Sequence, residues 1–406
     1  METDSRKRGV DGSWRFDADT IECEIRERIR HTIEVIVEEE LEATLGARPS
    51  QRVGAARHGY RHGHRERRLT TSVGPTTIAM PRARVEASDG GSVEWQSRTI
   101  RRYERRTERV DDALLGVYLS GANSRRIRGA LAPLLRGAPM GKDAVSRLVG
   151  RLKSDFETWR ERELAHDDVR YLFLDGWYPK VRLGKRRCRV PVLVVLGVRA
   201  DGHRVVLDLR LVGDESTAAW RALISKLVER HLAMPALVVI DGNPGLAGAL
   251  REQWPGLRIQ RCTAHKLRNL EAKVPAALRE ELKEDYRRMI YAETTEAITK
   301  ARITFRKKWQ LRCPSVVESL DEAADELFTF TAFPSSQWKA LRTTNALERI
   351  NEEFRRRTKT QASLPSQDAV LLLLFGLLRT GRITLRRLVG WKDMPAEPAV
   401  KEKRAA

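Results

Sequence analysis

Cysteine is scarce in this chain of 406 residues. The four cysteines lie far apart, without the spacing of a disulfide framework, at Cys23, Cys188, Cys262 and Cys313. Such usage argues against a disulfide-stapled secreted domain and fits a reducing cytoplasm. No apolar run reaches the roughly 18 residues that a membrane-spanning helix needs. The first residues, METDSRKRGVDGSW, lack the apolar stretch of a signal peptide. The sequence therefore predicts a cytoplasmic protein that does not cross a membrane.

Acidic charge is also in short supply. The chain has 55 Asp and Glu residues against 76 Lys and Arg residues, a net charge of +21. A surplus of this size favours a polyanionic partner, because each neutralised phosphate releases counterions. Nucleic acid is the expected partner, although a structural RNA-binding protein would show the same balance. Internal repeats, low-complexity segments and a phosphate-binding loop are all missing, so the sequence implies no nucleoside triphosphate.

An amphipathic helix is predicted over residues 20–46. Apolar residues recur at steps of four and Gly46 closes the segment. The stripe consists of Ile25, Ile29, Ile33, Val37, Leu41 and Leu45. It predicts either an ordinary core helix or a surface that pairs with another copy of the chain.

The stretch from 51 to 110 is strongly basic. Fourteen basic and six acidic residues give it a net charge of +8. Within it, RHGYRHGHRERR (57–68) mixes arginine, histidine and glycine, which favours a DNA-contacting loop. The candidate DNA-binding residues are Arg61, Arg65, Arg67 and Arg68. The histidines at 58, 62 and 64 suggest a metal site as an alternative, but no cysteine or acid completes it.

A second DNA-binding candidate covers residues 124–152, SRRIRGALAPLLRGAPMGKDAVSRLVGRL. Its pattern predicts a helix, a Gly/Pro turn and a second helix that begins near Asp143, the outline of a helix-turn-helix. Arg147 and Arg151 are the expected DNA contacts. Pro133 weakens this interpretation, and two generic packed helices explain the stretch almost as well.

Strand patterns begin near residue 170. Three runs, 170–181, 186–198 and 203–212, predict an antiparallel meander with RADG (199–202) as one turn. A helix over 216–232 then leads to a buried strand that ends at Asp241, and that strand should lie parallel to one of the first three. The sequence therefore predicts an α/β fold with a mixed sheet, followed by mainly helical structure after about residue 265.

Two aspartates, Asp175 and Asp241, stand at the ends of predicted strands. Each precedes a glycine, so each taken alone is also a plausible turn residue. Together on neighbouring strands they would repel one another unless a cation lies between them. Hard oxygen ligands suit Mg²⁺ or Mn²⁺, and a two-metal site of this kind serves phosphoryl transfer. Such a site needs a third carboxylate.

The segment TTNALERINEEFRRRTKTQ (343–361) supplies the third carboxylate. On a helix that begins near Thr344, Leu347, Ile350 and Phe354 form an apolar stripe, and Glu348 lies at its margin. Glu353 should lie on the other side of that stripe, in solvent. Further along the same helix, four basic residues are expected to follow a DNA backbone: Arg355, Arg356, Arg357 and Lys359.

These motifs resemble the Mutator-type transposases of bacterial insertion sequences over nearly the whole chain. The resemblance rests on FLDGWYPKVR, IDGNPGLAGAL, QRCTAHKLRN and TTNALERINEEFRRRTKT, in that order. The three carboxylates are 66 and 107 residues apart. Two departures are Gly176, where the family more often has alanine, and TQASLP, which lacks a glycine. The resemblance implies a ribonuclease-H-like catalytic core with a helical insertion between Cys262 and Glu348.

The implied activity is that of a DDE transposase. Asp175, Asp241 and Glu348 would be both catalytic residues and ligands of two Mg²⁺ or Mn²⁺ ions, with Cys262, His265 and Asn351 as accessory residues. The C-x-x-H pair is also a weak zinc candidate. Expected partners are double-stranded DNA, at element ends and targets, and further copies of the chain in a dimer or larger oligomer, at the nucleoid. A structure-specific nuclease and a non-catalytic DNA-binding regulator are the alternatives.

The expected domain organisation follows from these assignments. It comprises an N-terminal helix with a basic DNA-binding region (1–110), a helix-turn-helix-like region (111–165), the first part of the catalytic domain (166–265), the helical insertion (266–340), the remaining catalytic helices (341–390) and a tail (391–406). Together these predict an α/β catalytic core and a mainly helical N-terminal DNA-binding region.

Overall fold

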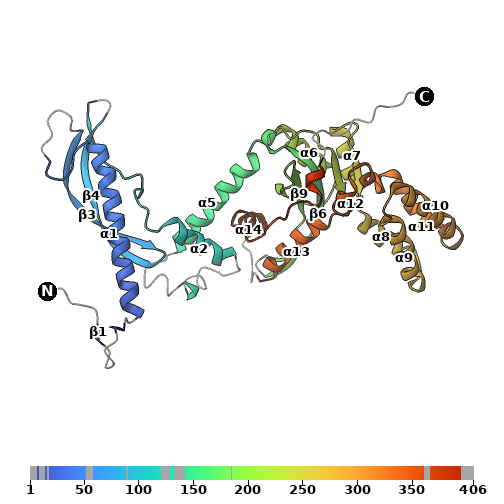
Figure 1. Ribbon diagram of the computed structural model, residues 1–406, viewed down its shortest axis with the longest axis horizontal. Helices are drawn as coiled ribbons and strands as arrows, with labels where there is room; N and C mark the ends of the chain where they lie inside the picture. Colours follow the sequence, from blue (N-terminus) through green and yellow to red (C-terminus); the bar gives the residue numbers. More distant parts are fainter. Residues whose placement is uncertain are drawn as a thin grey trace. The chain divides into compact units, whose positions relative to one another are not determined.

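The computed structural model describes residues 7–8, 14–15, 18–51, 58–87, 90–119, 129–131, 142–183, 185–360 and 366–394. It divides into two compact units, Met1–Gly150 and Arg151–Ala406. Figure 1 shows the elements of each unit along the chain.

A long helix packed on a small sheet forms the first unit. Helix α1 (Ala18–Leu45) covers an antiparallel sheet of order β3-β4-β5, made of β3 (Gly59–Thr71), β4 (Gly74–Glu86) and β5 (Ser92–Glu94). Val37, Leu41 and Leu45 are buried against the sheet, so the predicted helix is confirmed, and the second half of its apolar stripe forms the buried face. Ile25, in the first half of α1, remains exposed. Two short strands, β1 (Lys7–Arg8) and β2 (Trp14–Arg15), precede α1, and α2 (Glu108–Leu119) follows the sheet.

Two expectations for this unit were wrong. The basic stretch 57–68 is not a loop: from Gly59 it forms β3, paired with β4 from Gly59↔Val85 to Thr71↔Gly74. In the described part of the unit a three-stranded sheet therefore accompanies the helices, where a mainly helical region was expected. Most of the predicted helix-turn-helix lies outside the described residues, and its second helix is α5 (Lys142–Glu161).

A five-stranded mixed sheet forms the centre of the second unit. Its order is β10-β9-β6-β11-β12. The strands are β6 (Val169–Trp177), β9 (Val192–Arg199), β10 (Arg204–Leu211), β11 (Leu237–Ile240) and β12 (Ile259–Arg261). The meander β6-β9-β10 is antiparallel and β11 is parallel to β6, as the sequence predicted.

The second predicted strand is two strands. Pro191 lacks a backbone N–H and separates β8 (Arg186–Arg189) from β9. Strand β8 pairs with β7 (Lys180–Leu183) in a separate hairpin.

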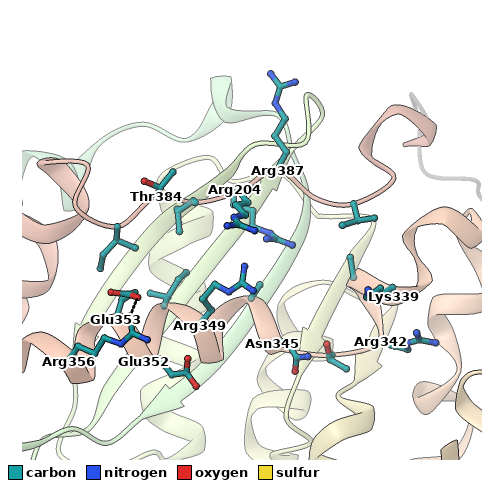
Figure 2. A pocket seen from close by; sticks show the side chains of 18 of the residues that line it. Arg204, Lys339, Arg342, Asn345, Arg349, Glu352, Glu353, Arg356, Thr384 and Arg387 are labelled. Atoms are coloured by element: carbon teal, nitrogen blue, oxygen red, sulfur yellow. Dashed lines mark hydrogen bonds and ion pairs between the residues drawn. The ribbon is translucent and has the colours of Figure 1, made fainter.

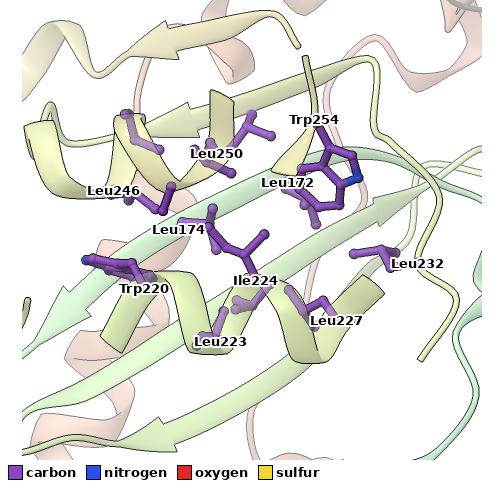
Figure 3. Packing of buried hydrophobic residues seen from close by; sticks show 14 of the residues in the cluster. Leu172, Leu174, Trp220, Leu223, Ile224, Leu227, Leu232, Leu246, Leu250 and Trp254 are labelled. Carbon is purple, nitrogen blue, oxygen red and sulfur yellow. The ribbon is translucent and has the colours of Figure 1, made fainter. Parts of the chain in front are cut away.

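One face of the sheet carries the main hydrophobic core. Helices α6 (Thr217–Glu229) and α7 (Pro244–Gln253) pack on this face. Figure 3 shows Trp220, Ile224 and Leu250 from these helices around Leu172 and Leu174 of β6. Because side chains alternate along a strand, Phe173 and Asp175 face the other way.

Helices α12 (Ser335–Leu341) and α13 (Asn345–Thr360) lie on the opposite side of β6. The Tyr171 hydroxyl donates to Gln337 Oε1 at 2.8 Å, and the rings of Trp177 and Phe354 are 5.5 Å apart. Phe354, with Leu347 and Ile350, forms the buried stripe predicted for this helix.

The described residues between β12 and α13 are mainly helical, as predicted for 266–340. The main helices of this insertion are α8 (Thr263–Glu271), α9 (Arg279–Ile290), α10 (Thr295–Arg312), α11 (Pro314–Ala323) and α12. Glu322 ties the insertion to the sheet edge, because its carboxylate accepts from both Arg261 and Lys266.

Helix α14 (Asp368–Arg379) packs beside β10, where the Phe375 ring contacts Phe156 and Trp159 of α5. No helix in the described part of the chain is both long enough and apolar enough to cross a membrane.

Candidate active site

Two aspartates meet at one end of the sheet. Strands β6 and β11 are parallel, and their register pairs Leu174 with Ile240. Asp175 and Asp241 each follow the paired residue, so they occupy equivalent positions beside one another. Asp241 directly follows β11 as predicted, but Asp175 lies within β6 and not at its end, because β6 stays paired with β9 as far as Trp177. This placement follows from the rule that the carboxyl ends of parallel strands share one edge of a sheet. The prediction that the two strands are neighbours is confirmed.

Both aspartates are on the side of the sheet opposite to α6 and α7. Leu174 and Ile240 belong to the core on that other side, and the next side chain along each strand points away from it. Helix α13 comes to meet Asp175: Asn351 Nδ2 donates to Asp175 Oδ2 at 3.1 Å. Glu348 lies one turn before Asn351 on the same polar stripe of the helix, as predicted.

The acidic side chains at this site repel one another. Burial of the Asp175 carboxyl, followed by the negative charge of Asp241, raises the pKa of Asp175 from 3.8 to about 7. Glu215 and Glu348 contribute in the same direction, and His265 opposes them. Several acids therefore share one environment, and one of them holds its proton near neutral pH.

The oxygen atoms of these side chains are suitable ligands for a hard cation. It offers three carboxylates and the buried Asn351 Oδ1, which has no hydrogen-bond partner. Among the described residues, however, no three Asp, Glu, His or Cys side chains are close enough to hold one ion as they stand. Glu348 Oε1 instead accepts from Arg268 at 3.0 Å. To complete a metal site, Glu348 would have to turn from Arg268 toward the aspartates.

Cys262 and His265 form a local link beside the acids. The backbone N–H and the Oγ1 hydroxyl of Thr344 both donate to Cys262 Sγ at 3.4 Å, and His265 also hydrogen-bonds this sulfur. Although burial acts in the other direction, these hydrogen bonds lower the pKa of the Cys262 thiol. The bond to Cys262 raises the pKa of His265. The pair thus fastens the start of α13 to the start of α8.

Glu215 was missed by the sequence reasoning. It precedes α6, and its carboxylate accepts from Tyr178 Oη at 2.6 Å, Asn243 Nδ2 at 3.1 Å and Trp220 Nε1 at 3.2 Å. A Cβ at Gly176 would lie 2.3 Å from Glu215 Oε2, so the glycine makes room for this acid. The sequence marks Glu215 only by its position beside Ser216, which caps the N-terminus of α6.

Asn243 holds the second aspartate in place. Its backbone N–H donates to Asp241 Oδ1 at 2.9 Å, and its side chain caps the N-terminus of α7. Between them, Gly242 has φ +108°, and a Cβ there would lie 2.6 Å from the Arg261 guanidinium. An Asn followed by Pro244 at a helix start is a capping signal that the sequence did carry.

The predicted DNA-binding residues differ in how they are placed. Arg61 donates to Glu38 and to the Ala47 carbonyl, and Arg67 donates to three backbone carbonyls in 100–104. These two arginines therefore have structural partners within their own unit. Six others are at least partly exposed, namely Arg65, Arg68, Arg147, Arg151, Arg355 and Arg356.

The remaining basic residues of the predicted set are on α13. Arg357 is partly buried, and the Lys359 side chain lies outside the described residues. Arg356 donates to Glu353 at 2.7 Å, so Glu353 is half-buried in an ion pair where free solvation was expected. The role of all ten residues in DNA binding stays a prediction.

Comparison with known families places the chain among the transposases. It belongs to the Mutator family, whose model matches residues 14–382. The chain is 30% identical over 353 residues to the transposase for insertion sequence element ISRM5 of Rhizobium meliloti, covering 87% of this chain and 86% of the relative. It is 32% identical to the transposase for IS406 of Burkholderia multivorans, covering 87% and 89%. The resemblance inferred from the motifs is confirmed.

Proposed function

We propose that this chain is a DNA transposase that binds the terminal inverted repeats of an insertion sequence, cuts DNA at the element's end and joins the end to target DNA. The observation that carries the proposal is the pairing of Leu174 with Ile240, which sets Asp175 and Asp241 side by side facing α13. Family membership supports the same function. The sheet order, with three antiparallel strands followed by two parallel ones, supports a ribonuclease-H-like core.

Asp175, Asp241 and Glu348 act as the DDE carboxylates in this proposal. The residues would hold two Mg²⁺ or Mn²⁺ ions, which when bound activate the attacking oxygen and stabilise the leaving one. Asn351 fixes Asp175 through Oδ2 and leaves Asp175 Oδ1 for a ligand. Arg268 holds Glu348 at the edge of the site until the carboxylate turns inward. In each of the two reactions one phosphodiester bond breaks and one O–P bond forms, so no triphosphate is consumed.

The partners follow from the same reaction. Double-stranded DNA is the substrate at both element ends and targets, and the net charge of +21 favours its binding. A pair of element ends requires two active sites, which supports a homodimer or a larger oligomer on DNA. We propose a cytoplasmic, nucleoid-associated location on this basis.

The test removes the charge of one proposed carboxylate ligand in each variant. Glu348→Gln keeps the shape and helix propensity nearly constant and removes one negative charge from the site. We expect this variant to fold and to bind a duplex that carries the element's inverted repeat, while cleavage and joining fall by several orders of magnitude. Asp175→Asn and Asp241→Asn should behave alike. The measurement is the yield of nicked and joined product from a labelled duplex with Mg²⁺.

The matched control is Glu318→Gln on α11, an exposed glutamate of the insertion. It should retain the parent's activity, because exposed side chains contribute little. Full activity in Glu348→Gln would refute the assignment of the third carboxylate. A parent that nicks but never joins would identify a nuclease, and a parent that binds without any product would identify a regulator.

A further inference from the structure

A basic hollow lies beside α13, away from the paired aspartates. Its volume is about 840 Å³, and eight basic and two acidic side chains contribute to its wall. Figure 2 shows Arg349 of α13 and Arg204 of β10 directed into the same space, with Lys339 of α12 along one side. We call this hollow the arginine groove. Its net charge of +6 within one cavity needs an explanation, because like charges repel.

The central arginines of the groove have no acidic partner. The Arg204 Nε is buried without a hydrogen-bond acceptor, and within the described residues neither Arg204 nor Arg349 forms a salt bridge. Burial, with the nearby charge of Arg349, lowers the pKa of Arg204. Partial burial of the Arg204 guanidinium without an acceptor is unfavourable, and a bound anion would offset this cost. The arrangement therefore indicates a site for a negatively charged ligand.

The walls of the groove are fixed before any ligand arrives. The segment 382–389 forms one wall, and Ile383 and Leu388 anchor it in the core. The Leu388 N–H donates to the Gly202 carbonyl at 2.9 Å, and Gln337 Nε2 donates to the Gly390 carbonyl at 3.0 Å. A preformed wall reduces the ordering entropy that binding would otherwise cost.

The spacing of the charges distinguishes a strand backbone from a small anion. Arg349 and Arg356 are seven residues apart on α13, which places them about 10 Å apart along the helix axis. Along the axis of a DNA duplex, the phosphates of one strand advance about 3.4 Å per nucleotide, so a backbone that runs along α13 could meet both arginines across about three nucleotides. One phosphate would have to draw both side chains together, so this separation favours contacts to more than one phosphate. Arg356 would exchange Glu353 for a phosphate, and the exposed Glu352 slightly weakens the attraction.

We propose that the arginine groove binds the sugar–phosphate backbone of a DNA strand without regard to base sequence. The inference rests on the proposed function, because DNA is the polyanion that this function supplies. It assigns Arg204, Arg349 and Lys339 to DNA binding, and none of the three was among the DNA-binding residues predicted from the sequence. It also places one DNA strand along the flank of α13 that carries Arg349 and Arg356.

The test uses the full chain and a double variant, Arg204→Gln/Arg349→Gln. Its binding is measured by fluorescence anisotropy across a salt series, with one duplex that carries the inverted repeat and one random duplex of equal length. We expect affinity for both duplexes to fall by about a hundredfold at low salt, and the salt slope to decrease by about two. Lys300→Gln/Lys307→Gln removes the same charge from an exposed face of α10 and should leave both quantities unchanged.

Thermal unfolding tests whether weaker DNA binding merely reflects a loss of folded structure in the variant. Without DNA, the Arg204→Gln/Arg349→Gln variant should be as stable as the parent or more so, because Arg349 is exposed and Arg204 is a partly buried charge without an acidic partner. Unchanged affinity for both duplexes would overturn the proposal and favour an acidic protein segment as the occupant. A loss confined to the inverted-repeat duplex would overturn its sequence independence. A parent that binds neither duplex would instead contradict the proposed function itself.

Discussion

Replacement of Asp175 by asparagine should stabilise the metal-free protein above neutral pH. The pKa of this carboxyl rises from 3.8 to about 7 in the folded chain, and each unit corresponds to about 1.4 kcal/mol. The full shift therefore amounts to about 4 kcal/mol of unfavourable free energy once the folded carboxyl ionises. Asp175 is partly exposed, and solvent screening reduces this to about 2–4 kcal/mol.

The direction of the pH dependence of stability follows from the number of protons that each state binds. Between about pH 4 and pH 7, the folded state keeps a proton that the unfolded state has already released, so the stability of the parent falls as pH rises. The amide of the Asp175→Asn variant cannot ionise and still offers an oxygen to Asn351 Nδ2. This variant should match the parent near pH 4 and exceed its free energy of unfolding by about 2–4 kcal/mol near pH 8.

The assay is urea unfolding with a chelator present at both pH values. Asp325→Asn is the control, because that carboxylate is 95% exposed and its ion pair with Arg302 is solvated, so its loss should change stability little. Addition of Mg²⁺ at the higher pH should stabilise the parent more than Asp175→Asn, because binding to the folded state adds to its stability. A variant that is less stable than the parent at high pH would refute the electrostatic account of this site. A variant whose free energy of unfolding differs from the parent's by the same amount at both pH values would refute it too.

Two further predictions concern the supports of the site and the first DNA-binding candidates. Gly176→Ala should cost about 1–3 kcal/mol of folding stability, because the new Cβ displaces the Glu215 carboxylate from its three hydrogen bonds. In a Glu215→Ala background, Gly176→Ala should cost much less folding stability. A double-mutant cycle by urea unfolding measures this, and additive effects of the two substitutions would contradict the explanation. Charge reversal at Arg147 and Arg151 should weaken binding to element ends without loss of folding. The slope of log affinity against log salt should fall by about one per lost contact, and an unchanged slope in anisotropy titrations would remove both from the DNA-binding set.

The sheet and its aspartates were predictable because their signals are local. Apolar, β-branched runs over 192–198 and 237–240 fix the strands, and a strand that ends directly on Asp241 fixes the position of its carboxylate. The apolar stripe of α13 likewise fixed which side of that helix is buried. In these cases the periodicity within one segment determines the outcome.

Strand β3 was missed because its own sequence, GYRHGHRERRLTT, shows no apolar alternation over its first half. It is a strand because β4 pairs with it over its length and α1 covers its apolar end. The arginine groove was missed for a related reason. Arg204, Lys339 and Arg349 come from three separate segments, and only the packing of α12, α13 and β10 brings them together. Glu215 is a single acid without a motif, recognisable only from its contacts.

Helix α13 relates the two parts of the proposed function to each other. Successive residues of a helix differ in direction by about 100°, so Glu348 and Arg349 leave the same turn toward different sides. The stripe of Leu347, Ile350 and Phe354 keeps the helix seated on the sheet between them. A helix with side chains is about 10–12 Å wide, so a strand in the arginine groove would run within roughly that distance of the carboxylates. Backbone binding on one side of α13 would then position DNA for the acids on the other, and the rigid helix would fix the distance between the two.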